Sequence, residues 1–143
     1  MPSKFQNTMV RQYMKIAVSL YKVSGGSIGG KMRGAPVLLL TTSGRKTGNP
    51  YTNPLIYGKD GDRFVVIASY GGAPQHPGWW RNLLKTPKAT VQVGKESFTV
   101  TASEATGEER DRLWTLMTGL YADYDAYQKK TDRQIPVVIL ERT

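Results

Sequence analysis

The chain has 143 residues, 39% of them hydrophobic, and a formal net charge of +9 at pH 7. This length suits a single globular domain with a real core. Cysteine is absent and histidine occurs once, as His76, which excludes disulfides, thiolate metal ligands and a cysteine nucleophile, so we expect no metal site.

The positive charge is concentrated in the first 59 residues. This stretch holds nine Lys and Arg and no acidic residue, whereas residues 60–143 hold eleven of each sign. Such an asymmetry raises the local concentration of anions on one side of the molecule. It indicates an anionic partner, which composition alone leaves open as a small polyanion, an acidic membrane surface or nucleic acid.

The N-terminal region predicts a basic amphipathic helix over residues 4–23, with apolar side chains at helical spacing: Phe5, Met9, Tyr13, Ile16 and Leu20. Two interpretations stay open, a helix packed on the core and a helix lying on an anionic membrane. Residues 24–30 contain four glycines and predict a flexible linker. We therefore expect residues 1–30 to form this helix and linker, and residues 31–143 to form the body of the protein.

From residue 35 onward the pattern predicts strands at 36–42, 51–57, 63–69, 89–93, 97–103 and 135–141. We expect 51–57 and 63–69 to form a hairpin through the turn at 58–62. A short helix is predicted over 78–84, and a capping box of Thr106 and Glu109 starts another that buries Leu113, Trp114, Met117 and Leu120. Because the helices do not alternate with the strands, we expect an α+β fold, mainly β: a split antiparallel barrel with appended helices.

One strand leads directly into a candidate anion cradle. Residues 38–40 are apolar, and the turn that follows carries Gly44, Arg45, Lys46, Thr47 and Gly48. The glycines allow backbone N–H groups to approach a ligand, and the two cations suit a phosphate or carboxylate. The plainer interpretation is a polar turn with solvated charges.

Three other segments are candidates for chemistry. Residues 68–72 end a strand in a hydroxyl and two glycines, where backbone can approach a flat ring. Residues 76–83 open a helix with adjacent tryptophans, Trp79 and Trp80, of which we expect only one to be in the core. Tyr121, Tyr124 and Tyr127 recur every three residues and would share one face, either half-buried on the barrel or lining a pocket.

Taken together, these segments resemble the deazaflavin-dependent nitroreductases of actinobacteria, which use coenzyme F420. The resemblance rests on an ordered set of motifs over roughly residues 34–140: 41–48, 53–55, 68–73, 77–83, the three tyrosines and 131–137. It implies a split β-barrel of the flavin-binding type that holds the cofactor in a groove.

The resemblance also assigns roles. It implies that Arg45, Lys46 and the turn amides, including Thr47 and Gly48, hold the phosphate and glutamate tail of F420. It implies that Pro54, Leu55 and Ile56 line the deazaflavin ring, that Ala68, Ser69, Gly71 and Gly72 border its other edges, and that Trp79 and Asn82 form the wall on the helix side. Asn53, Tyr70 and Gly78 are further expected cofactor contacts. Tyr121, Tyr124 and Tyr127 would face the substrate, with Tyr124 as the first and Ser69 as the second candidate for a catalytic hydrogen-bond donor.

Two positions depart from the family pattern, since relatives often have a basic residue where Tyr51 and Tyr70 stand. This departure bears on substrate preference and affinity more than on the identity of the cofactor. A deazaflavin brings the hydride itself, so the protein needs to supply position, electrostatics and a proton source rather than a catalytic triad. The absence of an obvious triad in the sequence fits this expectation.

We therefore expect an enzyme, an F420H2-dependent reductase that transfers a hydride to an electron-poor small molecule such as a quinone, an enone or a nitro-aromatic. The alternatives are an FMN-dependent oxidoreductase on the same barrel, or a non-catalytic basic barrel that binds nucleic acid or membrane. We expect no nucleic-acid partner, because the aromatic residues do not interleave with the basic ones. The N-terminus has no long apolar run, so the expected location is the cytoplasm, with peripheral association with the membrane as an option. The sequence leaves the oligomeric state open.

Overall fold

The structure is a computed structural model that describes residues 15–143. Residues 15–24 are helical, so Phe5, Met9 and Tyr13 of the predicted helix lie outside the described residues. The other elements in chain order are β1 (Lys31–Met32), β2 (Ala35–Ser43), β3 (Pro50–Ile56), β4 (Gly58–Asp60), β5 (Arg63–Ile67), the 3-10 helix η1 (Tyr70–Gly72), α2 (Gly78–Lys85), β6 (Lys88–Val93), β7 (Glu96–Glu104), α3 (Gly107–Leu120), α4 (Asp123–Lys129) and β8 (Val137–Arg142).

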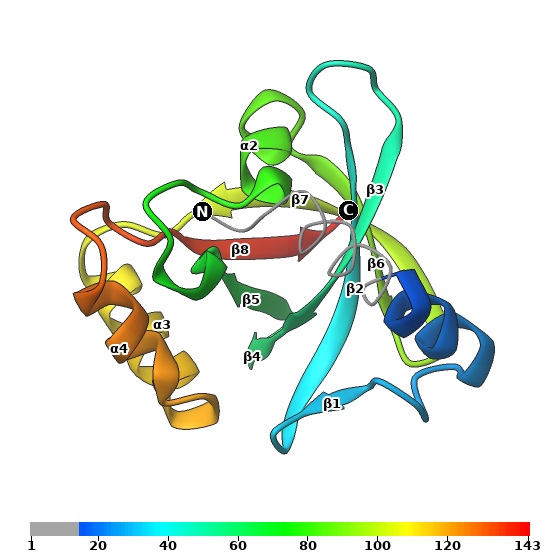
Figure 1. Cartoon of the computed structure of the whole chain (residues 1–143), viewed down its shortest axis with the longest axis horizontal. Helices are drawn as coiled ribbons and strands as arrows, with labels where there is room; N and C mark the ends of the chain where they lie inside the picture. The colour runs from blue at the N-terminus through cyan, green and yellow to red at the C-terminus, as the bar shows by residue number, and fades with distance from the viewer. Residues whose placement is uncertain (1–14) are drawn as a thin grey trace, which may run out of the picture.

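The strands form one curled antiparallel sheet in the order β1-β2-β6-β7-β8-β5-β4, with β3 paired to β2 outside this path. Every pairing is antiparallel. Figure 1 shows α3 and α4 together at one side of the sheet and the helix of residues 15–24 at the opposite side. The predicted α+β class and the split barrel are confirmed.

Strand β2 is central to the core because side chains on both of its faces are buried. Val37 and Leu39 join a cluster with α3 and α4, whereas Leu38 and Leu40 join a second cluster with α2. Alternate side chains of a strand point to opposite faces. The continuous apolar run at 37–40 is thus typical of a strand covered on both sides.

Strand β3 pairs differently from the predicted hairpin. Residues of β3 pair with β2 over the whole register from Val37↔Ile56 to Ser43↔Pro50. Only the short β4 forms the expected hairpin with β5, from Gly58↔Val65 to Asp60↔Arg63. The prediction that 51–57 pairs with 63–69 was wrong, because the cradle turn at 44–49 is itself the hairpin loop that folds β3 back onto β2.

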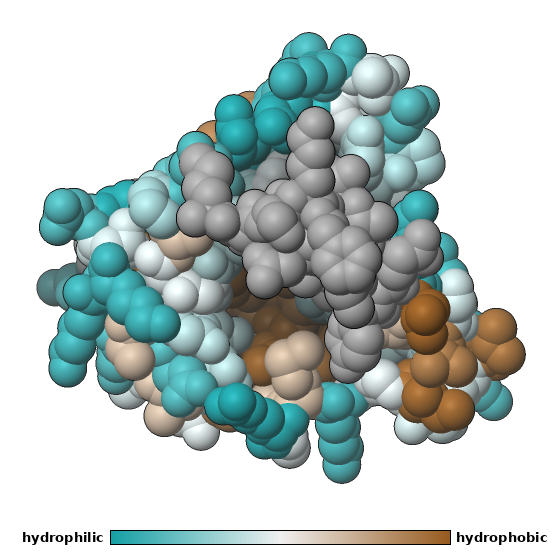
Figure 2. Space-filling model, viewed as in Figure 1, coloured by the Kyte–Doolittle hydropathy of each residue, from teal (hydrophilic) through white to brown (hydrophobic). Residues whose placement is uncertain are grey.

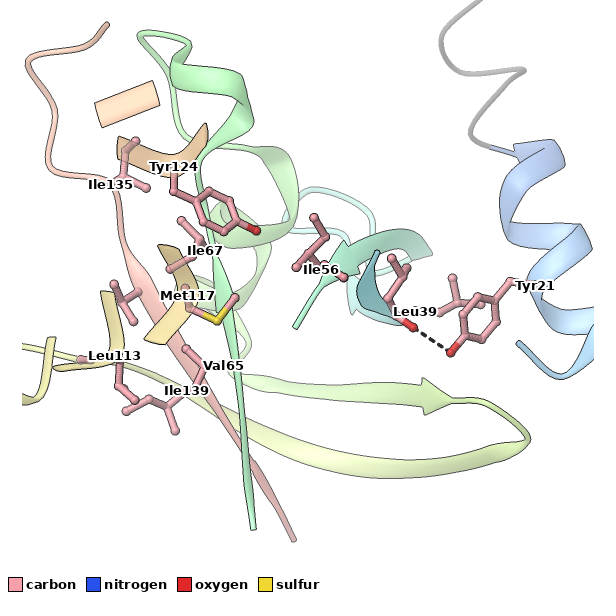
Figure 3. Close-up of a cluster of buried hydrophobic side chains, with 14 residues drawn as sticks. Tyr21, Leu39, Ile56, Val65, Ile67, Leu113, Met117, Tyr124, Ile135 and Ile139 are labelled. Atoms are coloured by element: carbon pink, nitrogen blue, oxygen red, sulfur yellow. Dashed lines mark hydrogen bonds between the residues drawn. The ribbon is translucent and has the colours of Figure 1, made fainter. Parts of the chain in front are cut away.

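The helix of residues 15–24 contacts the barrel through a residue that the periodicity did not select. Ile16 and Leu20, on the predicted apolar face, are 58% and 44% exposed, whereas Tyr21 is 1% exposed. The Tyr21 hydroxyl donates to the carbonyl oxygens of Val37 (3.0 Å) and Gln92 (3.3 Å) and accepts from the Gly94 N–H (2.9 Å). Figure 3 shows Tyr21 reaching β2 from this helix. The boundary at residue 30 stays a prediction, but the helix packs on the barrel.

Helix α3 begins at Gly107 after Thr106, as predicted, but the capping box does not form. Thr106 makes no side-chain cap hydrogen bond, and Glu109 instead accepts from Arg63 at 3.1 Å. Leu113 and Met117 are buried as expected, whereas Leu120 is 38% exposed and Trp114 is only half-buried. The prediction that Trp114 and Leu120 are buried was wrong, because α4 covers only part of α3.

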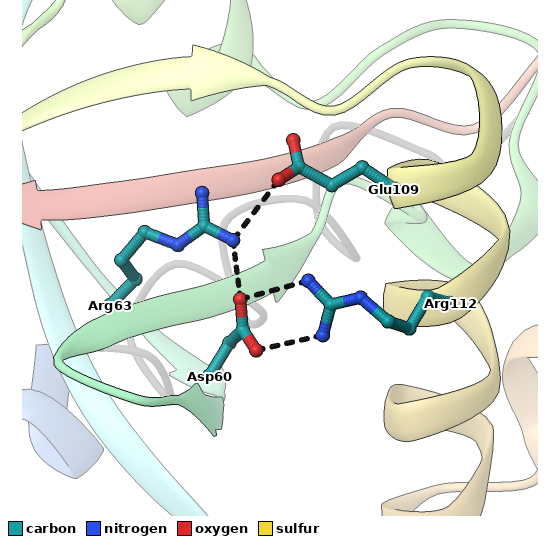
Figure 4. Close-up of polar contacts among 4 residues, drawn as sticks. All are labelled: Asp60, Arg63, Glu109 and Arg112. Atoms are coloured by element: carbon teal, nitrogen blue, oxygen red, sulfur yellow. Dashed lines mark hydrogen bonds and ion pairs between the residues drawn. The ribbon is translucent and has the colours of Figure 1, made fainter.

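A network of charged side chains ties α3 to the β4–β5 hairpin (Figure 4). Arg112 binds both carboxylate oxygens of Asp60, at 2.8 and 3.1 Å, and Arg63 bridges Asp60 and Glu109. The hydrogen bonds from Arg112 and then from Arg63 hold the pKa of Asp60 well below its ordinary value. These arginines have carboxylate partners and therefore serve the scaffold.

Candidate active site

A pocket of about 810 Å³ opens between the β2–β3 loop, the segment after β5, the start of α2, and α4. Figure 2 shows a hollow with apolar walls near the centre of the viewed face. The predicted residues that line the pocket are Arg45, Lys46, Thr47, Asn53, Pro54, Leu55, Ile56, Ser69, Tyr70, Gly71, Gly78, Trp79, Asn82, Tyr121, Tyr124 and Tyr127. Segments far apart in the sequence thus meet around one space of the size that small-molecule ligands occupy.

Three predicted cofactor contacts do not line the pocket: Gly48, Ala68 and Gly72. Gly48 lies in the cradle loop with φ 77°, Ala68 is fully buried at the end of β5, and Gly72 is buried against α4. Gly44 of the predicted cradle lines the pocket as well. The lining residues that were not among the predicted site residues are Met32, Tyr51, Ile67 and Pro77. Met32 and Ile67 carried no signal in the sequence beyond their apolar character.

The cradle at one end of the pocket is a compact loop. The Gly44 N–H donates to the Asn49 carbonyl oxygen at 2.7 Å, and the Gly48 N–H donates to the Gly44 carbonyl oxygen at 2.8 Å. A Cβ on Gly44 would lie 2.5 Å from the ring of Tyr51, so a larger residue there would have to displace this ring. Arg45 and Lys46 line the pocket, and neither forms an ion pair within residues 15–143.

Asn82 of α2 orients Arg45. Its side-chain oxygen accepts from the backbone N–H of Arg45 at 3.2 Å and from the guanidinium at 3.0 Å, while its amide donates to Thr42 at 3.0 Å. Asn82 is 4% exposed, so this position holds a buried and satisfied polar group. Lys85 adds a hydrogen bond to the Arg45 carbonyl oxygen at 2.7 Å. The cationic end of the pocket is thereby held in place before any ligand binds.

The tryptophans of α2 are both buried. Trp79 is 6% and Trp80 4% exposed, so the expectation that only one belongs to the core was wrong. The cluster around Leu38 and Leu40 is wide enough to take both rings, because α2 packs directly on β2. Trp79 nevertheless lines the pocket as well, beside Pro54 and Leu55.

The segment after β5 has an unusual backbone. Tyr70, Gly71 and Gly72 have φ of 47°, 63° and 80°, which places three consecutive residues in the left-handed region. Glycine adopts this region freely, but a tyrosine there is uncommon and is held by its surroundings. The Tyr70 side chain is 62% exposed at the pocket, as is Tyr51 at 51%, so both departures from the family pattern lie at its rim.

The three tyrosines form the other end of the pocket. Their ring centroids lie 5.0 to 6.3 Å apart, and the hydroxyls of Tyr121 and Tyr127 are 3.0 Å apart. Tyr124, the middle one, is 5% exposed, and its hydroxyl makes no hydrogen bond to residues 15–143. Figure 3 shows the Tyr124 ring pointing away from α4 toward the space between Ile67 and Ile56.

The electrostatics of this end keep the phenols protonated. Burial, followed by the neighbouring Tyr121 and Tyr127, raises the pKa of Tyr124 above its ordinary value. The hydrogen bond to Tyr127, followed by burial, raises the pKa of Tyr121 to about 12. At neutral pH both groups therefore carry the proton that a hydrogen-bond donor needs.

The rim beside the tyrosines is formed by the turn between β1 and β2. Met32 lines the pocket there, and Arg33 reaches across to α4, where its guanidinium lies 2.8 Å from the Asp123 carboxylate and 5.7 Å from the centre of the Tyr121 ring. Arg33 has φ of 49°. The pair is largely exposed, so it contributes little to stability.

The fold and the pocket together describe a split antiparallel barrel whose pocket has a cationic end at Arg45 and Lys46 and an aromatic end at the three tyrosines. Residues 13–142 match the model of the F420H(2)-dependent quinone reductase family, and the chain belongs to that family. It is therefore an enzyme, an F420-dependent oxidoreductase.

The chain is 41% identical to an F420H(2)-dependent quinone reductase of Mycobacterium tuberculosis over 135 residues, which cover 92% of this chain and 91% of the relative. A solved F420-H2 dependent reductase is 41% identical, with a TM-score of 0.69 over 74% of this chain and 94% of that one. A third relative, solved as a domain-swapped dimer, is 34% identical, with a TM-score of 0.72 over 94% and 98% of the two chains.

Proposed function

We propose that the pocket holds F420H2 with its anionic tail at Arg45 and Lys46, and that a quinone lies against Tyr121, Tyr124 and Tyr127 while it is reduced. The observation that carries this proposal is the continuity of the pocket, which has a cationic end and an aromatic end within about 810 Å³. When bound, the cofactor supplies a hydride. The residues of the chain then have to bind, orient and provide a hydrogen-bond donor.

The residues fit such a cofactor. Arg45 is held by Asn82 and has no carboxylate partner within residues 15–143, so its charge is available to an anion. Pro54, Leu55 and Trp79 give the middle of the pocket apolar walls suited to a flat ring. Ser69 and Gly71 would border the ring on the opposite side.

Tyr124 is the proposed donor on the acceptor side. A quinone that accepts a hydride develops negative charge on oxygen and takes up one proton to become a hydroquinone, and a donor placed at that oxygen stabilises the charge. Tyr121 and Tyr127 satisfy one another at 3.0 Å, whereas the Tyr124 hydroxyl has no partner within the described part of the chain. Ser69 is the second candidate, because it lines the same pocket.

The cofactor assignment is tested by titrating the protein into F420 and following fluorescence, with FMN and an oligonucleotide as competing ligands. Arg45→Ala combined with Lys46→Ala should weaken F420 binding by several kcal/mol at most, since each charge-assisted hydrogen bond contributes roughly 1.5 to 3 kcal/mol. The control pair Lys88→Ala and Lys95→Ala removes the same charge outside the pocket. If both double variants weaken F420 binding equally, the cradle acts only through the net charge of the protein. Tighter binding of FMN than of F420 would favour the flavin alternative.

The donor assignment is tested by Tyr124→Phe, which keeps the ring. Loss of a hydrogen bond to a developing charge should lower kcat/KM for quinones roughly tenfold to a hundredfold, with F420 affinity nearly unchanged. Tyr121→Phe is the matched control, because its hydroxyl is already paired. Unchanged kcat/KM in Tyr124→Phe for quinone, enone and nitro-aromatic acceptors would move the donor role to Ser69 or to water.

A second proposal concerns the surface of the N-terminal helix, which we propose binds an anionic membrane. Ile16, Leu20, Val23 and Ile28 are 44% to 88% exposed, and Lys15, Lys22 and Lys31 are exposed nearby. Figure 2 shows apolar atoms gathered at the edge where Figure 1 places this helix. Apolar side chains flanked by lysines suit the interface of an anionic bilayer. No helix within residues 15–143 is long and apolar enough to cross a membrane.

Sedimentation with vesicles measures this binding. Leu20→Gln combined with Val23→Gln should reduce binding to vesicles containing phosphatidylglycerol, while Leu84→Gln, at a 62% exposed leucine of α2, should not. If the helix variant binds these vesicles as well as the unmodified protein does, the membrane proposal is wrong and the reductase proposal is unaffected.

A further inference from the structure

Arg133 connects two walls of the pocket without lining it. It lies between α4 and β8, and its guanidinium donates to three backbone carbonyl oxygens of the segment after β5: Ser69 at 2.6 Å, Ala73 at 2.9 Å and Ala68 at 3.2 Å. The terminal nitrogen that donates to Ala68 also lies 3.0 Å from Nδ1 of His76. One side chain thus contacts both ends of the segment that contains Tyr70, Gly71 and Gly72.

The same arginine is fixed to the tyrosine side. Gln128 of α4 donates from its side chain to the Arg133 carbonyl oxygen at 2.8 Å and accepts from the Ile135 N–H at 2.9 Å. The fixed fork of a guanidinium can serve several carbonyls at once, which a lysine ammonium cannot do with the same geometry. Arg133 is therefore well placed to set the distance between the two walls.

The two walls also touch directly. Gly72 packs so closely on α4 that a Cβ there would lie 2.6 Å from the Tyr127 carbonyl oxygen. The segment keeps Tyr70 in the left-handed region, which an L-residue adopts only where its surroundings impose it. The Arg133 contacts to Ser69 and Ala73 hold the chain on both sides of this residue.

We infer that Arg133 is a positioning residue that holds the Ser69–Gly72 wall at a fixed distance from Tyr124 and Tyr127 of α4. It thereby keeps the cofactor ring and the acceptor at the distance and orientation that hydride transfer needs. This inference rests on the proposed function. A displacement of reacting groups by about 1 Å costs up to a hundredfold in rate. Binding of the cofactor tail depends on the cradle, which is built from other residues.

The sole histidine of the chain gives a readout independent of catalysis. Nδ1 of His76 faces Arg133, with Arg81 and Glu104 as the other charged groups that act on it. Burial first, and then the Arg133 charge, lowers the pKa of His76 below its ordinary value. Removal of Arg133 should therefore raise the His76 pKa toward 6.5, the ordinary value. In tag-free protein the imidazole signals of this one residue can be followed by NMR during a pH titration.

The experiment compares Arg133→Ala and Arg133→Lys with Arg142→Ala, a control arginine on β8 that pairs with Glu96 away from the pocket. We expect Arg133→Ala to lower kcat roughly tenfold to a hundredfold with F420 affinity within about threefold. Millimolar guanidinium should restore part of kcat, because it refills the space that the side chain leaves. Arg133→Lys should keep the fold and the lowered pKa of His76 but lose part of kcat. This variant provides the test if Arg133→Ala fails to fold.

Several outcomes decide against the inference. An unchanged kcat in Arg133→Lys and Arg133→Ala, or a His76 titration that is the same with and without Arg133, would overturn it. A loss of F420 affinity that matches the loss of kcat would make Arg133 a residue of general stability. If the unmodified protein neither binds F420 nor reduces quinones, the proposed function fails on its own, while the His76 titration still reports whether Arg133 holds the segment.

Discussion

The two ends of the pocket are built in different ways. The cradle end comes from one hairpin loop, residues 44–49, with support from Asn82 and Lys85 of α2. At the tyrosine end, Arg133 contacts residues of the segment 68–76 that lie 57 to 65 positions away in the chain, and Gly72 packs on α4. The charge of the cradle can therefore be altered with little change in stability, whereas changes at the tyrosine end also disturb the fold.

The strongest test of this difference is Gly72→Ala. An alanine at φ 80° is strained, and its Cβ would lie 2.6 Å from the Tyr127 carbonyl oxygen. We expect a loss of about 3 kcal/mol or more in the free energy of unfolding, from the left-handed backbone and the forced shift of α4. Urea unfolding measures it.

Gly71→Ala is the matched control, because Gly71 has φ 63° and no atom within 4 Å of an added Cβ. It should cost about 1 to 2 kcal/mol from the backbone alone. Equal losses in the two variants would mean that the contact with α4 does not constrain the wall.

At the cradle end, Asn82→Ala should have the next largest effect. It removes the buried amide that holds Arg45 and leaves Thr42 without this donor. We expect a loss of about 1 to 3 kcal/mol in unfolding free energy, together with weaker F420 binding. Lys46→Ala should weaken F420 binding without loss of stability. If Lys46→Ala lowered the free energy of unfolding as much as Asn82→Ala does, the charge of the cradle would not be separable from the fold.

The tyrosine end should also make the stability of the protein depend on pH in the alkaline range. The pKa of Tyr121 is raised to about 12, above the ordinary value of 10.0. A raised pKa means that the folded state holds the proton more tightly, so this contribution is complete below pH 10 and is lost as pH rises from 10 to about 12. Thermal unfolding between pH 9 and 12 should show the decline, and Tyr121→Phe should reduce it. An identical alkaline decline in that variant would assign the effect to other groups.

The smallest effect is expected at the rim. Arg33→Gln breaks an exposed ion pair with Asp123 and should cost less than about 1 kcal/mol in stability. Because Met32 of the same turn lines the pocket near Tyr121, we expect a change in KM for the acceptor with F420 affinity unchanged. Steady-state kinetics with a small and a bulky quinone would reveal it, and KM values unchanged from those of the unmodified protein for both quinones would exclude a role of the rim.

The cradle and the strands around it could be predicted from local sequence patterns. Arg45 and Lys46 are adjacent in a glycine-containing turn after an apolar run, and that spacing survives folding because the loop is one hairpin. The pattern also singled out Trp79 and the three tyrosines, and the family resemblance added Pro54 and Leu55; all of them line one pocket. Their roles there stay predictions.

Long-range contacts were beyond the sequence. Periodicity placed Ile16 and Leu20 on the apolar face of the helix, yet Tyr21 is the residue that the helix buries against the barrel, since its hydroxyl hydrogen-bonds backbone groups there. The pairing of β3 with β2 could not be derived from strand propensity, because two adjacent hairpins compete for the same strand. Arg133 belongs to the motif at 131–137 but had no predicted role, because nothing local marks an arginine whose partners are carbonyls about sixty residues away.

The Tyr21 contacts have a consequence for cooperativity of unfolding. One hydroxyl touches β2 at Val37, β6 at Gln92 and the turn at Gly94, so release of the helix would leave polar backbone groups of two strands without a partner. Hydrogen exchange should therefore show the amides around Tyr21 opening together with the ends of β2 and β6 rather than fraying alone. A protease cut within residues 24–30 would then leave two fragments that stay associated under native conditions.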